Sequence, residues 1–107
     1  MANFTSSPIS EYKVVLYGEK GTSVIGAFIH CYHSSKNIMS CVFYNDENNV
    51  PANSKGPRVE LRYPMSKFSE VLDVLRNEEP LYFGFIESTK VGYIATHKEP
   101  VGEEEEG

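Results

Sequence analysis

The chain has 107 residues, of which 40% are hydrophobic, and this length accommodates one hydrophobic core. That apolar content excludes a disordered chain, and no apolar run approaches the roughly 20 residues that a membrane-spanning helix needs. The formal net charge is −5, but the glutamates at 103–106 carry four of those charges, so the body of the chain is nearly neutral. Residues 1–10 lack the basic start and the apolar stretch of a secretory signal, so we expect a soluble, cytoplasmic protein that has no contact with a membrane.

The composition along the chain predicts three parts. Residues 1–10 are small and polar and indicate a flexible N-terminal arm. Residues 11–102 alternate between apolar segments and turn residues, which predicts a single α+β domain without internal repeats. Residues 103–107 form an acidic tail that we expect to be disordered, because adjacent like charges repel one another and bury nothing.

The first half of the domain predicts three strands. Residues 12–17, 23–33 and 38–44 are rich in β-branched and aromatic side chains, and clusters of Gly, Ser, Lys and Asn separate them. A polar loop of thirteen residues, 45–57, follows the third strand and is long for a strand connection. A fourth strand is predicted over residues 58–63, where apolar and charged residues alternate: Val59, Leu61 and Tyr63 lie on one side, and Arg58, Glu60 and Arg62 on the other.

The helix is predicted over about residues 66–78. Phe68, Val71, Leu72 and Leu75 recur at helical spacing, so they form one apolar stripe, and Pro80 ends the segment. Residues 81–86 and 91–97 then predict two further strands. The order ββββαββ indicates an α+β fold with a curved antiparallel sheet of about six strands and one amphipathic helix.

The second and fifth predicted strands are apolar on both faces, as residues 23–33 and 81–86 show. One short helix covers one face of a sheet, so the other face of these strands requires another neighbour. Either the sheet curls on itself, or its second face meets another subunit or a flat ligand such as a base. We expect a homodimer, because self-complementary apolar faces form one.

No pattern of catalytic residues is present, and we expect that the protein is not an enzyme and has no cofactor and no metal site. His30 and His33 fall on opposite faces of a strand, so they could share a metal ion only if a bulge lay between them. Cys31 and Cys41 are expected to be free thiols that fill the core as small hydrophobic side chains.

Basic and aromatic residues are interleaved on the predicted strands, a combination that proteins binding single-stranded nucleic acid use. The alternative is that the aromatic residues fill a core and a subunit interface, which would make the protein a protein-interaction module without nucleic-acid binding. The candidate nucleic-acid contacts are Arg58, Arg62, Lys13, Tyr32 and Tyr44.

From Tyr12 to Asn77, the order of four strands followed by a helix resembles the PC4-type and Whirly-type single-stranded-DNA-binding transcription regulators. The resemblance implies a curved sheet with the helix packed behind it, a dimer, and binding of single-stranded DNA on the sheet and its hairpins. The segment Pro80-Leu81-Tyr82-Phe83 and residues 99–103 also resemble small cyanobacterial proteins of unknown function. Relative to a bare PC4-type unit, the two strands after the helix are additional.

Overall fold

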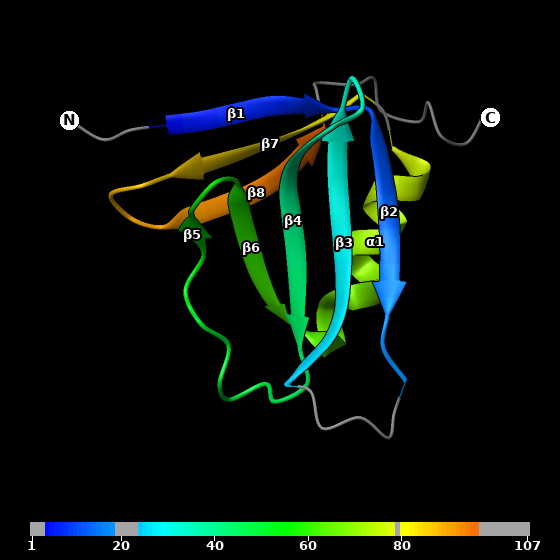
Figure 1. Ribbon diagram of the computed structural model, residues 1–107, viewed down its shortest axis with the longest axis vertical. Helices are drawn as coiled ribbons and strands as arrows, with labels where there is room; N and C mark the ends of the chain where they lie inside the picture. The colour runs from blue at the N-terminus through cyan, green and yellow to red at the C-terminus, as the bar shows by residue number, and fades with distance from the viewer. Residues whose placement is uncertain (1–3, 19–23, 79, 97–107) are drawn as a thin grey trace.

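The computed structural model describes residues 4–18, 24–78 and 80–96, which form two β-sheets and one α-helix (Figure 1). The larger sheet has five strands, in the order β2 (Glu11–Leu16), β3 (Ile25–His33), β4 (Lys36–Tyr44), β6 (Val59–Pro64) and β5 (Ser54–Lys55). The smaller sheet has three, in the order β1 (Phe4–Ile9), β7 (Leu81–Ile86) and β8 (Val91–Thr96). A 3-10 turn, η1 (Met65–Lys67), leads from β6 into the helix α1 (Phe68–Asn77).

The α+β class is confirmed, and every predicted element of the domain is present near its predicted place. The arrangement differs in two respects from a single antiparallel sheet of about six strands. The strands divide between two sheets, and β4 and β6 run parallel, with Cys41 beside Leu61. Parallel neighbours need a connection that returns to the starting end of the first strand, usually of a dozen residues or more. The long polar loop 45–57 supplies that return and contributes the short strand β5.

The prediction of a flexible arm over residues 1–10 does not match the structure, in which Phe4–Ile9 form β1 and pair antiparallel with β7. The polar composition of this segment gave no strand signal, although the segment forms a strand whose side chains Thr5, Ser7 and Ile9 are partly buried on one side. Pro8 is compatible with the strand because β1 lies at the edge of the small sheet, where a residue without an N–H group is tolerated. The predicted acidic tail, 103–107, lies outside the described residues.

The core lies between the inner face of the five-stranded sheet, the helix and the three-stranded sheet. Figure 1 shows α1 behind the larger sheet, and the apolar stripe predicted for the helix packs against the core there. Gly92 in β8 faces Leu61 in β6, and any larger side chain at this position would collide with that leucine. The fully buried members of the core include Ala27, Ile29, Met39, Phe43, Val59, Leu61, Phe83 and Phe85.

Both cysteines are free thiols in this core, as predicted. Cys31 on β3 and Cys41 on β4 have no solvent exposure, and β3 pairs with β4 so that Cys31 lies opposite Met39 and Cys41 opposite Ile29. A hydrogen bond with Cys31, together with burial, raises the pKa of the Cys41 thiol well above its usual range. The Cys41 thiol therefore stays protonated and unreactive while the domain is folded.

Candidate nucleic-acid interface

The face of the five-stranded sheet that points away from α1, called the outer face below, carries a mixture of cations and rings. Strand pairing places Lys13, His30, Ser40 and Glu60 side by side across β2, β3, β4 and β6. The next row toward the other end of the sheet holds Val15, Phe28, Val42 and Arg62. In the row between them, Ile29, Cys41 and Leu61 are buried on the core side, which is why their neighbours point outward.

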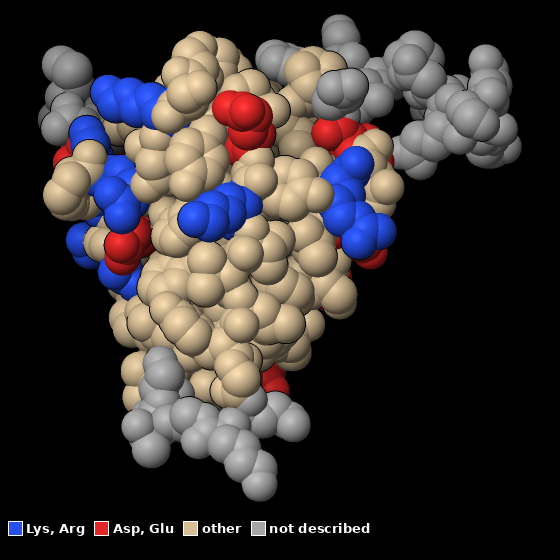
Figure 2. Space-filling view, turned by 45° about the vertical axis from the view of Figure 1, so that its right-hand side comes forward, with Lys and Arg blue, Asp and Glu red and all other residues tan. Residues whose placement is uncertain are grey.

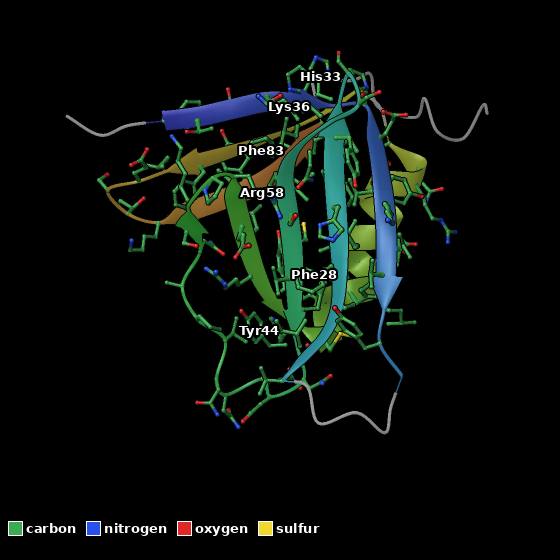
Figure 3. All side chains as sticks on the ribbon, in the orientation of Figure 1. Phe28, His33, Lys36, Tyr44, Arg58 and Phe83 are labelled. Carbon is green, nitrogen blue, oxygen red and sulfur yellow. The ribbon has the colours of Figure 1, made fainter. Side chains whose placement is uncertain are left out.

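All five residues predicted as nucleic-acid contacts belong to this face. Lys13 lies on β2, Tyr32 on β3 and Tyr44 on β4, while Arg58 immediately precedes β6 and Arg62 lies within it. Figure 3, which views the sheet from this side, shows Tyr44 and Arg58 at different heights along the strands. The sequence thus selected residues of one surface, although it did not predict how their strands pair.

Three aromatic rings contact one another in a row on the outer face, and none of them was among the nucleic-acid contacts predicted from the sequence. The Phe28 ring stacks on the His30 imidazole, with ring centroids 5.2 Å apart and planes 15° apart. Tyr17, which is 46% exposed, meets Phe28 edge-on with centroids 6.1 Å apart. The signal was present in β3, where residues 28, 30 and 32 all carry rings and share one face. We refer to Tyr17, Phe28 and His30 as the ring ladder.

The guanidinium of Arg62 is occupied by hydrogen bonds and an ion pair within the protein. Its Nη1 donates to the carbonyl oxygen of Ala52 at 2.6 Å and to Ser54 Oγ at 2.7 Å. Its Nη2 forms an ion pair with Glu60, and its Nε donates to Tyr44 Oη at 3.2 Å. Nη1 therefore fastens the end of the 45–57 loop to the sheet, while Nη2 and Nε hold the guanidinium against β6 and β4.

Lys13 and Arg58 are the cations of the outer face that remain available to a ligand. Both residues are exposed, and neither side chain forms a hydrogen bond or an ion pair within the part of the chain that the structure describes. They influence His30, because both positive charges lower the pKa of its imidazole. Two free cations thus flank the rings, a position from which they can reach the phosphates on either side of a stacked base.

His30 lies in the middle of this arrangement. Its Nδ1 is 2.7 Å from Ser40 Oγ, and Ser40 is almost completely buried between the neighbouring strands. Burial is the largest influence that lowers the pKa of His30, followed by Arg58 and then Lys13, whereas Glu60 raises it. The imidazole is therefore neutral at neutral pH.

Charged and uncharged areas are separated on the surface seen in Figure 2. Most of the blue and red atoms lie over its upper half, and the broad area below them is tan except for red atoms at its lower edge. A second apolar feature borders this face at β2, the terminal strand of the sheet, where Val14 is 39% and Leu16 63% exposed.

A metal site and a membrane-spanning helix find less support in the described residues. They contain no group of three or more His, Cys, Asp or Glu side chains placed to hold a metal ion. Their helix is too short and too polar to cross a membrane. A comparison of the chain with protein-family models, with curated proteins and with solved structures finds no match.

Proposed function

We propose that the protein is a dimeric module that binds single-stranded nucleic acid on the outer face, as the PC4-type and Whirly-type regulators bind on their sheets. The observation that carries the proposal is the ring ladder, which lies on the same face as the free cations Lys13 and Arg58. Aromatic side chains on an exposed sheet accept the flat faces of unpaired bases, and neighbouring cations contact the phosphates.

The proposed binding is modest in strength and tolerant of sequence. Each stacked base contributes roughly 1–3 kcal/mol regardless of its identity, because every base has a π-face. Glu60 lies on the same face and opposes the cations, and the chain as a whole is acidic. A duplex hides its base faces within the stack, so the ladder favours single strands over double strands.

A protein-interaction module without nucleic-acid binding is the alternative proposal. The exposed apolar residues support it: Val14, Leu16 and Tyr17 at the β2 edge, Val24 immediately before β3, and Phe4 and Val91 on the three-stranded sheet. Exposed apolar patches of this kind mark contacts with other proteins. The two proposals differ in whether polyanions compete for the outer face.

The nucleic-acid proposal predicts a loss of salt sensitivity when the free cations are removed. A labelled single-stranded oligothymidine is titrated at two salt concentrations with the parent and with the double variant Lys13→Ala, Arg58→Ala. Two lost phosphate contacts should flatten the slope of log K against log salt by about 1.4, at about 0.7 per contact. Fluorescence anisotropy measures both slopes.

The matched control is Lys67→Ala, Arg76→Ala, which removes the same number of cations from exposed positions of η1 and α1 on the other side of the sheet. This control should bind as the parent does. Equal losses in the two double variants would mean that net charge, not the outer face, attracts the oligonucleotide. A parent that does not bind at low salt would favour the protein-interaction module.

The dimer is the second part of the proposal, and we place its interface at the free edge of β2. Tyr17 N donates to the carbonyl oxygen of Gly26, so the odd-numbered residues of β2 bond to β3. The N–H and C=O groups of Tyr12, Val14 and Leu16 then point to the free edge. Antiparallel pairing of two copies about Val14 places Leu16 of one copy beside Tyr12 of the other, which buries the exposed apolar side chains.

We therefore expect light scattering to report a dimer at micromolar concentration and Val14→Asp, Leu16→Asp to be monomeric, because the paired edges would then carry facing carboxylates. The control Phe4→Asp, Val91→Asp changes equally exposed apolar residues of the other sheet and should stay dimeric. A monomeric parent would remove this part of the proposal.

A further inference from the structure

We propose that His30 is a proton-dependent phosphate contact at the centre of the outer face, so that the protein binds single strands more tightly at mildly acidic pH than at pH 8. The inference rests on the proposed function and assigns His30 a role in the same site. It depends on where the imidazole lies and on which groups surround it.

The geometry holds the imidazole in a defined orientation in either protonation state. Phe28 stacks on one side of the ring, and Ser40 Oγ lies 2.7 Å from Nδ1. A serine hydroxyl donates to a neutral Nδ1 and accepts from a protonated one, so this hydrogen bond persists when the ring gains a proton. Nε2 is the ring nitrogen left for a ligand, and after protonation it is a charged N–H donor, which favours a phosphate oxygen.

The charges around His30 come from both neighbouring sides. Lys13 faces His30 from β2. On the other side, Glu60 faces His30 from β6 and Arg58 from the position immediately before β6, and β4 contributes the uncharged Ser40. In the free protein, burial and the two cations disfavour the imidazolium more than Glu60 favours it. A phosphate that contacts Lys13 or Arg58 adds negative charge beside the ring and so favours the imidazolium.

Binding and protonation are therefore linked, because a ligand that raises the pKa of a group binds more tightly to its protonated form. The free protein has a neutral ring at pH 8, and its affinity there depends on the other contacts. As the pH falls through the pKa that His30 has in the complex, the complex takes up a proton at His30 and the affinity increases. Each unit by which the complex raises the pKa contributes up to about tenfold in affinity.

The test uses a labelled oligothymidine, since thymine does not titrate in the range of interest. The full chain is titrated at about pH 8 and about pH 5.5 at constant ionic strength, a range that spans histidine protonation. We expect binding on the order of tenfold tighter at the lower pH, with a salt slope steeper by about 0.7 for one more phosphate contact. His30→Gln, which keeps a hydrogen-bonding group but cannot be charged, removes one ring of the ladder and should weaken binding at both pH values, and it should lose the pH dependence that His30 contributes.

The control is the double variant His33→Gln, His97→Gln, which removes the other two histidines; His33 is exposed beyond the ladder (Figure 3), and His97 lies outside the described residues. It should keep the full pH dependence. A direct readout is the imidazole proton resonance of His30, whose titration should move to higher pH when the oligothymidine is bound.

Four results would overturn the inference. A parent that binds equally well at both pH values, or a His30→Gln variant that keeps the parent's pH dependence, removes the role of His30 and leaves the proposed function intact. A His30 titration that the oligothymidine does not move has the same consequence. Absence of binding at both pH values in low salt removes the proposed function, and the role of His30 with it.

Discussion

Replacing Phe43 by alanine should lower the free energy of unfolding by roughly 3–5 kcal/mol, the cost of removing a fully buried phenylalanine. Phe43 has no solvent exposure and joins three elements. Its ring stacks on Tyr63 of β6 at 5.4 Å and meets Phe68 of α1 edge-on at 5.1 Å. The substitution therefore leaves a cavity where β4, β6 and the helix meet, and a domain of this size has only about 5–15 kcal/mol of stability.

Phe4→Ala is the matched control, because it removes the same atoms from a side chain that is 55% exposed. It should change the free energy of unfolding by less than about 1 kcal/mol, as surface substitutions do. Urea denaturation followed by circular dichroism measures both variants. If Phe43→Ala cost no more than Phe4→Ala, the packing between the sheet and α1 described above would be wrong.

Replacing Phe28 by alanine should weaken binding of single-stranded oligothymidine by on the order of tenfold or more, which corresponds to the roughly 1–3 kcal/mol of one stacked base. Phe28 is the middle ring of the ladder and contacts both Tyr17 and His30, so its loss removes the central platform. The salt slope should stay unchanged, because Lys13 and Arg58 are untouched. Anisotropy titrations at about pH 8, where histidine is neutral, measure the affinity without the contribution of His30 protonation.

Phe28→Tyr keeps the aromatic face and should retain the affinity of the parent. Urea denaturation of both variants separates a loss of stacking from a loss of folding, since Phe28 is half-buried. If Phe28→Ala folds and binds as the parent does while the Lys13→Ala, Arg58→Ala variant is impaired, the outer face attracts polyanions by charge alone. That result would exclude the ring ladder as a base platform.

The sequence by itself determined the local elements and their faces. The spacing of Phe68, Val71, Leu72 and Leu75 predicted α1 to within a few residues, and residues 81–86 predicted β7. These predictions hold because a period of 3.6 or 2 residues reports directly which side of a helix or strand is buried. For the same reason, the alternation of residues 58–63 placed Arg58, Glu60 and Arg62 on the side away from the core.

Tertiary structure alone decided which strands are neighbours. Nothing in residues 36–44 or 59–64 separately indicates a parallel pair, and β1 finds its partner β7 at the far end of the described chain. The same pairing places Ser40 beside His30 and the 45–57 loop beside Arg62. Arg62, which was predicted to contact phosphate, therefore bonds within the protein. His30, which was not among the predicted contacts, lies at the centre of the outer face. The periodicity of a segment shows which of its faces is buried. It does not show which distant segment forms the neighbouring strand, and that neighbour supplies the hydrogen bonds and side-chain contacts.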